Sequence, residues 1–233
     1  MRTRFFLFAF FIISLVHLLS EFYGWTPLVF WTKILLMPLL IAALWWKLPK
    51  AEINRSIQLA LLALVFSTAG DLFLLVEKTR NQEVYFFLGL GSFLLAQISY
   101  CFSFLSLGLQ RIPMVWKVIY PLYYLVFILL LLPVLPPVLL IAVILYGLSL
   151  TAMAWNSWKT LTGKGWRAYA GIAGAILFLI SDSLLAINRF KISIPQAGFW
   201  IMATYIAAQY LIVQGIVNKS RSNLNSAEGL VNG

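Results

Sequence analysis

The chain has 233 residues, of which 62% are hydrophobic and 10% are charged, with a formal net charge of +10 and a mean hydropathy of +0.93. Soluble domains are about 45–50% apolar and about 25% charged, so this composition excludes an ordinary soluble domain. We expect an all-α, polytopic integral membrane protein with a single transmembrane domain over residues 1–217. The basic residues fall in short loops between apolar stretches, so they are interpreted as topology signals and no nucleic-acid partner is expected.

Eight apolar stretches are each long enough to cross a bilayer as a helix, which takes about 20 residues. We expect these spans at approximately residues 5–22, 27–46, 55–76, 84–107, 114–132, 136–158, 168–189 and 195–217. No small-residue cleavage site follows the first span, which predicts a transmembrane helix and not a cleaved signal peptide. The proline cluster at residues 133–137 predicts a tight hairpin between the fifth and sixth spans. Residues 218–233 are polar and rich in Asn and Ser, which predicts a disordered tail.

Lysine and arginine residues are distributed unequally between the two sides of the predicted membrane domain. The side of the amino terminus holds twelve of them, namely Arg2, Arg4, Lys47, Lys50, Arg55, Arg111, Lys117, Lys159, Lys164, Arg167, Lys219 and Arg221. The opposite side holds four, namely Lys78, Arg80, Arg189 and Lys191. By the positive-inside rule this distribution predicts that both termini lie in the cytoplasm, which agrees with an even number of spans. The short loops favour a bacterial inner membrane.

Asp71 and Asp182 are the only aspartates in the chain, and both lie inside predicted spans. A carboxylate at the centre of a bilayer costs about 2.5–3.5 kcal/mol even on a lenient insertion scale. Lys33 is the one basic residue inside a span, and at about 1.5 Å per residue all three groups lie roughly 8–11 Å below the outer surface, with His17 at a similar depth. We therefore interpret the aspartates as functional and Lys33 as their neighbour. The alternative is that they are polar groups that hold helices together.

A second polar layer lies deeper in the predicted bundle. It consists of Gln97, Tyr100, Tyr146, Tyr205 and Gln209. Gln97 and Tyr100 are three residues apart, and Tyr205 and Gln209 are four apart, so each pair shares a helix face. An amide facing lipid would lack hydrogen-bond partners, which predicts that both glutamines face a common polar interior. We expect this layer to bind substrate or support the aspartates, although ordinary packing is the alternative for each tyrosine.

The spacing of these residues suggests an internal duplication. Asp182 follows Asp71 by 111 residues, and Gln209 follows Gln97 by 112 residues. A 4+4 repeat with this offset would place the two aspartates on opposite sides of a central cavity.

His17 and Cys101 are the only histidine and the only cysteine in the chain. A zinc site of the usual kind, with three or four His or Cys ligands, cannot be assembled from them. No intrachain disulfide can form either. We expect neither a metal ion nor any other cofactor.

The motifs around the two aspartates resemble those of the YhhN family of eight-span membrane proteins, over about residues 5–215. They are Thr32-Lys33 with Pro38, Gly70-Asp71-Leu72-Phe73-Leu74, Phe86-x-x-Gly89-x-x-x-Phe93-Leu94-x-Ala96-Gln97-x-x-Tyr100, Gly174-Ala175-x-x-Phe178-x-x-Ser181-Asp182 and Tyr205-x-x-x-Gln209. The family commonly carries histidine at the position of Gln97. This difference favours a hydrogen-bonding role over a proton-transfer role for that residue.

The resemblance implies an activity, a substrate and a catalytic pair. Characterised relatives hydrolyse the vinyl-ether bond of lysoplasmalogens to a fatty aldehyde and glycerophosphoethanolamine or glycerophosphocholine. Carried over to this chain, Asp71 and Asp182 would be the catalytic residues with Lys33 beside them, and the partners would be a lysophospholipid substrate and bilayer lipid. Relatives also occupy the endoplasmic reticulum, which is therefore the second candidate location.

The chemistry of a vinyl ether agrees with two carboxyl groups. Protonation of the carbon farther from the oxygen gives an oxocarbenium-like ion, which water captures as a hemiacetal that collapses to aldehyde and alcohol. One protonated carboxyl and one carboxylate provide the same pair of functions in glycosidases. Burial raises the pKa of a carboxyl group, whereas a nearby lysine lowers it. In an Asp-Asp-Lys set, one aspartate can therefore keep the proton and act as the acid, while the other is ionised and orients water. The sequence does not assign the acid and the base.

Two other classes of protein use carboxyl groups inside membranes. An intramembrane aspartyl protease carries Gly-x-Gly-Asp, which residues 68–71 match only in half, and its second aspartate follows tyrosine where Asp182 follows Ser181. A proton-coupled transporter or carrier pairs acidic residues with lysine in a proton relay. The spans around the aspartates lack the Pro/Gly interruptions typical of carriers, which argues against that class.

Overall fold

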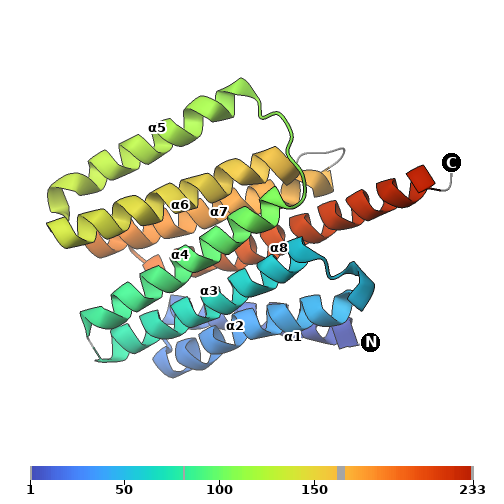
Figure 1. Ribbon diagram of the computed structural model, residues 1–233. Coiled ribbons are helices and arrows are strands. Elements are labelled where there is room, and N and C mark those ends of the chain that lie inside the picture. The colour runs from blue at the N-terminus through green and yellow to red at the C-terminus, as the bar shows by residue number, and fades with distance from the viewer. Residues whose placement is uncertain (1, 81, 162–165, 232–233) are drawn as a thin grey trace.

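The computed structural model describes residues 2–80, 82–161 and 166–231, and within these ranges every regular element is helical. The elements are α1 (Arg2–Tyr23), α2 (Thr26–Lys47), η1 (Lys50–Glu52), α3 (Arg55–Arg80), α4 (Glu83–Leu105), α5 (Met114–Leu131), η2 (Leu132–Val134), α6 (Pro137–Leu161), α7 (Trp166–Phe190) and α8 (Ala197–Val231). The α-helices lie roughly side by side in one bundle (Figure 1). The 3-10 turn η2 forms the hairpin that the proline cluster predicts.

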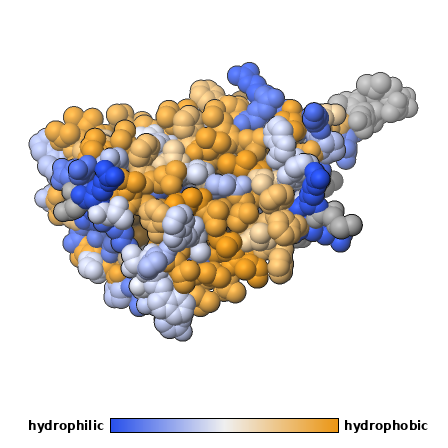
Figure 2. Space-filling view, turned by 90° about the horizontal axis from the view of Figure 1, so that it is seen from below, coloured by the Kyte–Doolittle hydropathy of each residue, from blue (hydrophilic) through white to orange (hydrophobic). Residues whose placement is uncertain are grey.

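The described residues include eight helices that are long and apolar enough to cross a membrane. Hydrophobic residues cover the middle of the face shown in Figure 2, and hydrophilic residues gather toward its two ends. In lipid, a helix satisfies its backbone hydrogen bonds internally, which explains why hydropathy locates these elements. The expectation of an all-α, polytopic membrane protein is confirmed.

Small residues allow α7 and α8 to approach closely. A methyl group built on Gly215 would lie 2.5 Å from the Cα atom of Gly171, so a larger residue at Gly215 would push the helices apart. Gly70 plays a similar part between α3 and α4, where a methyl group would lie 2.6 Å from the ring of Phe93. These contacts fix the depth and rotation of the helices that carry the two aspartates.

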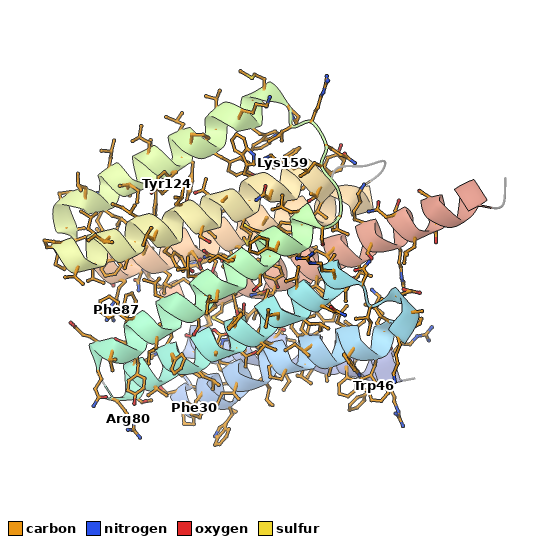
Figure 3. The ribbon with its side chains drawn as sticks, viewed as in Figure 1. Phe30, Trp46, Arg80, Phe87, Tyr124 and Lys159 are labelled. Carbon is orange, nitrogen blue, oxygen red and sulfur yellow. The ribbon has the colours of Figure 1, made fainter. Side chains whose placement is uncertain are left out.

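Helix α5 is the most loosely packed of the eight, at one edge of the bundle (Figure 1). Only two of its side chains, Tyr120 and Leu131, are buried, and its most extensive contacts are with α6. Tyr124 points from α5 toward α6 (Figure 3), and its hydroxyl donates to the backbone oxygen of Ile144 at 3.1 Å. This loose edge leaves room for a cavity between α5 and its neighbours.

The C-terminal segment differs from the disordered tail predicted from its composition, because α8 continues as a helix to Val231. Its polar side chains bond to loops at the same end of the bundle. Arg221 Nε lies 2.7 Å from Glu52 Oε2, and Asn223 Nδ2 donates to the backbone oxygen of Leu107 at 2.9 Å. The polar residues at the end of α8 therefore belong to a helix that bonds to loops outside the membrane core, and not to a disordered tail.

Candidate active site

Asp71, on α3, is buried between a cation and a phenol. Lys33 Nζ, from α2, lies 3.5 Å from Asp71 Oδ1, and the two side chains are only 15% and 4% exposed. Tyr205, from α8, donates its hydroxyl hydrogen to Asp71 Oδ2 at 2.9 Å. Lys33 and Asp71 thus form the ion pair that their similar depth predicts.

Asp182, on α7, has a different set of neighbours. Tyr146, from α6, donates to Asp182 Oδ2 at 2.5 Å, and Gln97 Nε2, from α4, donates to the same oxygen at 3.4 Å. Both donors are neutral, and no lysine or arginine forms an ion pair with Asp182 in the described parts of the chain. Gln97 Oε1 is buried and has no hydrogen-bond partner among the described residues.

Tyr100 and Gln209, the two remaining residues of the predicted polar layer, connect α4 and α8 to α3 one helical turn from Asp71. Tyr100 donates to Gln209 Oε1 at 2.5 Å, and Gln209 Nε2 donates to Ser67 Oγ at 2.9 Å. Ser67 lies one helical turn before Asp71 on α3, a spacing from which its participation could have been predicted. Gln97 and Gln209 are both buried and hydrogen-bonded, and Ser67 is an additional member of the polar layer. That the two glutamines share one interior stays a prediction.

Each aspartate accepts a hydrogen bond from a helix of the other half of the chain. Asp71 on α3 bonds to Tyr205 on α8, whereas Asp182 on α7 bonds to Gln97 on α4. The two carboxyl groups lie within electrostatic reach of each other. A 4+4 repeat would place a donor of each half beside the aspartate of the other half in this way, although the repeat itself stays a prediction. His17 joins neither aspartate, because its Nδ1 lies 2.8 Å from Thr32 Oγ1.

A cavity of about 550 Å³, counting the open space at its mouth, lies between α4, α5, α6 and α7. Its walls are mostly apolar and aromatic. They are formed by Phe86, Leu90, Tyr123, Tyr124, Phe127, Val143, Tyr146, Gly147, Leu150, Thr151, Asp182, Leu185, Ala186, Arg189 and Phe190. Asp182 and Tyr146 are therefore open to the cavity, whereas Asp71 and Lys33 are not among its lining residues. The aromatic residues of α5 in this wall were not predicted, since their spacing alone resembles ordinary packing.

Arg189 lies at the end of the cavity that is nearest the C-terminal end of α7. Its Nη2 is 2.8 Å from Glu77 Oε1, and its guanidinium stacks over the ring of Phe86 at 5.1 Å. The side chain is 43% exposed, so donors remain for a further partner. In the sequence, Arg189 is one loop charge among several, and only the fold shows that it faces the same cavity as Asp182.

The site contains two carboxyl groups in unlike surroundings, next to an apolar cavity with one cation, Arg189, in its lining. No group of three or more His, Cys, Asp or Glu side chains that could hold a metal ion occurs in the described residues. The arrangement suits proton transfer to an amphiphile whose apolar part enters the cavity and whose anionic part meets Arg189.

Comparison with known proteins identifies relatives of this chain. The YhhN family model matches residues 28–216. The lysoplasmalogenase TMEM86B of Homo sapiens is 34% identical over 150 residues, which is 64% of this chain and 59% of that protein. The Rattus norvegicus protein of the same name is 33% identical over 150 residues, 64% of this chain and 58% of that one. The lysoplasmalogenase TMEM86A of Homo sapiens is 32% identical over 162 residues, 66% of this chain and 63% of that protein.

The matches cover less than two thirds of the length of these relatives. No solved structure matches the chain.

Proposed function

Because the chain belongs to the YhhN family, we propose that it is a membrane-embedded hydrolase of lysoplasmalogen-type lysophospholipids. It would cleave the vinyl-ether bond to release a fatty aldehyde and glycerophosphoethanolamine or glycerophosphocholine. The observation that carries this proposal is the opening of the Asp182 carboxyl group into an apolar cavity, with neutral donors on only one of its oxygens.

The charges around the two aspartates support placing the proton on Asp182. Lys33 compensates the negative charge of Asp71, and a second carboxylate would stand uncompensated in a medium where an unpaired charge is costly. Tyr146 and Gln97 both donate to Oδ2 of Asp182, which leaves Oδ1 to carry the acidic hydrogen. Asp182 is thus the general acid, and Asp71 with Lys33 is a charge-balanced pair that leaves no cation to compensate an ionised Asp182.

Hydrolysis then proceeds with Asp182 as acid and subsequently as base. Its proton passes to the alkenyl carbon farther from the ether oxygen, which leaves an oxocarbenium ion beside a carboxylate. Water attacks the carbon bonded to oxygen and gives a proton to that carboxylate, which regenerates the acid. The hemiacetal transfers its hydroxyl proton to the glycerol oxygen as the carbon–oxygen bond breaks. The switch from acid to base is the one that a single carboxyl group makes in retaining glycosidases.

Gln97 provides a position for the attacking water. Its Oε1 is buried, lacks a partner among the described residues, and belongs to the amide that donates to Asp182. A buried acceptor in this situation is ordinarily satisfied by a water molecule. Water bound there is held beside the carboxyl group that must accept its proton. Histidine, common at this position in the family, has a ring nitrogen that can accept in the same way.

The lining of the cavity also matches the order of polar and apolar groups in a lysophospholipid. Asp182 and Arg189 are seven residues apart on α7, which separates them by roughly 10 Å along the helix. In the substrate, the three glycerol carbons and one oxygen separate the ether oxygen from the phosphorus. With the ether at Asp182, the phosphate extends toward the mouth, where the free donors of Arg189 can bind it. The alkenyl chain then lies toward Leu150, among the apolar residues of α5 and α6.

The site geometry favours this reaction over peptide-bond hydrolysis. The two carboxyl groups of an aspartic protease lie about 3 Å apart and share one proton. In the described residues no hydrogen bond joins Asp71 to Asp182, and each bonds to its own tyrosine. A proton-coupled carrier is the remaining alternative, and product analysis separates it from a hydrolase.

The test is release of free aldehyde by the purified protein from a lysoplasmalogen and from its saturated-ether analogue. We expect aldehyde only from the vinyl ether, because the saturated chain cannot be protonated to a stabilised cation. Asp182→Asn should lower the rate by about 10²–10⁴-fold, whereas Glu83→Gln, the same change at an exposed position of α4, should leave it unchanged. A folded wild-type protein that releases no aldehyde would refute the hydrolase. Full activity of Asp182→Asn would remove Asp182 from the mechanism.

A further inference from the structure

A second hollow lies at the opposite end of the bundle from Arg189, between α2, α7 and α8. It has a volume of about 730 Å³, counting the open space at its mouth, and it is polar. Its lining includes Lys47, Tyr210, Gln214, Asn218 and Arg221. Trp46, the neighbour of Lys47, marks this end of the molecule in Figure 3. None of these residues lines the cavity that contains Asp182.

The positive charge in this polar pocket exceeds the negative charge. Lys47 is half-buried, and its Nζ donates to an amide oxygen, Gln214 Oε1, at 2.7 Å. It forms no ion pair with a carboxylate in the described parts of the chain. Arg221 uses its Nε for Glu52, and it lies near enough to Lys47 for the two positive charges to repel each other. One anionic group would balance the set of two cations and one carboxylate.

An open apolar groove continues from the polar pocket along the lipid-facing side of α1 and α8. Phe11 and Leu15 line it on α1, and Ala207 lines it on α8. Tyr210 and Leu211 line both the groove and the polar pocket, so the two hollows are adjacent.

The part of this combined hollow between Ala203 and Gln214 is about as long as the hydrocarbon part of one leaflet. Eleven residues of α8 separate Ala203, which lines the groove, from Gln214, which lines the polar pocket. They span roughly 16 Å, and half of the hydrocarbon core measures about 15 Å.

We propose that this composite hollow binds one anionic phospholipid, with its headgroup phosphate between Lys47 and Arg221 and one acyl chain between α1 and α8. A headgroup with a single net negative charge neutralises the pocket, whereas a zwitterionic headgroup brings its own cation and does not. With the termini in the cytoplasm, as the positive-inside rule predicts, the site faces the leaflet in which anionic lipids attract basic residues. The bound lipid is separate from the substrate and would fasten α8 to α1 and α2.

Binding can be measured with purified protein in detergent, by native mass spectrometry and by the shift in Tm on adding lipid. The probes are phosphatidylglycerol, phosphatidylcholine with the same chains, and glycerol 3-phosphate as the headgroup without chains. We expect phosphatidylglycerol to bind and stabilise and the other two to bind much more weakly. Lys47→Gln should weaken phosphatidylglycerol binding about fivefold, which corresponds to the ~1 kcal/mol typical of one basic residue near anionic lipid. Lys117→Gln, at an exposed position of α5, should not weaken it.

A second variant tests the groove and does not depend on the polar pocket. Ala207→Phe fills the space between α1 and α8 and should weaken binding of the lipid without altering the weak binding of glycerol 3-phosphate. Equal affinity for phosphatidylglycerol and phosphatidylcholine would overturn the proposal. Unchanged binding by both Lys47→Gln and Ala207→Phe, or binding of glycerol 3-phosphate as tight as that of the lipid, would also overturn it.

Discussion

Asp71 and Asp182 have the same side chain and similar depth, yet their neighbours give them different charges in the proposed mechanism. A lysine 3.5 Å from Asp71 favours its ionised form, whereas two neutral donors at Asp182 allow it to keep a proton. Pairs of titratable groups whose environments differ in this way are how one site provides an acid at neutral pH. The assignment makes Asp182 the catalytic residue and Asp71 a positioning residue.

The ion pair of Lys33 and Asp71 provides a test of that division. Removing one partner of a buried pair leaves an uncompensated charge and typically costs about 3–5 kcal/mol of stability. We therefore expect Lys33→Met and Asp71→Asn each to lower both the Tm and the rate of aldehyde release. In the Lys33→Met/Asp71→Asn double variant no net charge is left, so Tm should recover and the rate should recover in part. Lys33→Arg should lower the Tm and the rate less than Lys33→Met does, because it keeps the positive charge. It should not restore wild-type values, because the guanidinium differs in shape from the ammonium group.

The double variant also shows whether Asp71 takes part in the chemistry. If it regains wild-type Tm but stays as inactive as Asp182→Asn, the Asp71 carboxylate itself acts on water or substrate, which is the role that the family resemblance implies. Unchanged rate and Tm in Lys33→Met alone would show that the lysine side chain reaches the outer surface and leaves Asp71 unpaired.

The members of the site could be predicted from the sequence more fully than their pairings. Charge at membrane depth identified Asp71, Asp182 and Lys33, and the cost of an amide in lipid identified the two glutamines. Helix periodicity gives the face on which a side chain lies but not the rotation of one helix against the next. For this reason the sequence did not show that Gln97 bonds to Asp182, while Tyr205 bonds to Asp71.

At the scale of helices, α5 and α6 form the wall that, in the proposed function, would determine which lipid chains fit. Leu150 lies at the inner end of the cavity, on the side where the alkenyl chain is expected. Leu150→Trp should shorten the space for the chain, and it should therefore raise KM for long-chain substrates more than for short-chain ones. Steady-state rates over a series of alkenyl chain lengths measure this effect. A tryptophan that over-packs this position can lower the free energy of unfolding by about 1–3 kcal/mol. The Tm of the variant is therefore measured together with its rates.

A matched control lies on the same helix. Leu148 is 53% exposed on the lipid-facing side of α6, and Leu148→Trp should change neither KM nor its dependence on chain length. If Leu150→Trp affects all chain lengths equally, the chain does not lie at that end of the cavity.

The helices themselves were predictable because lipid leaves the backbone few alternatives. Hydropathy located the eight spans, since only a helix satisfies the backbone of these segments within the bilayer. The proline cluster located the turn at η2. The end of α8 was not predicted, because its polar residues resemble a solvated tail in composition. Their partners, such as Glu52 for Arg221, lie far away in the sequence and become neighbours only through the fold.

At the scale of the whole molecule, the cavity with Asp182 and the polar pocket with Lys47 lie at opposite ends of the bundle, and a different ligand is proposed for each. The cavity with Asp182 extends to Arg189, toward the end of the bundle that carries Arg80 in Figure 3, and the polar pocket with Lys47 lies at the end that carries Trp46. Helix α1 begins and α8 ends at this second end (Figure 1). The substrate headgroup would therefore enter from one leaflet, and the anionic lipid would bind from the other.

The direction of the bundle in the membrane decides which leaflet supplies the substrate, and the Lys/Arg distribution predicts it. With both termini in the cytoplasm, Gln82 and Ser193 lie outside and Ser222 lies inside, and all three side chains are exposed. Cysteine is introduced singly at each position in a Cys101→Ser background. An impermeant thiol reagent added to intact cells should then label Gln82→Cys and Ser193→Cys at once, but Ser222→Cys only after the membrane is opened. The background protein without cysteine is the control for non-specific labelling. Labelling of Ser222→Cys alone in intact cells would reverse the orientation, so that substrate headgroups would reach Arg189 from the cytoplasmic leaflet.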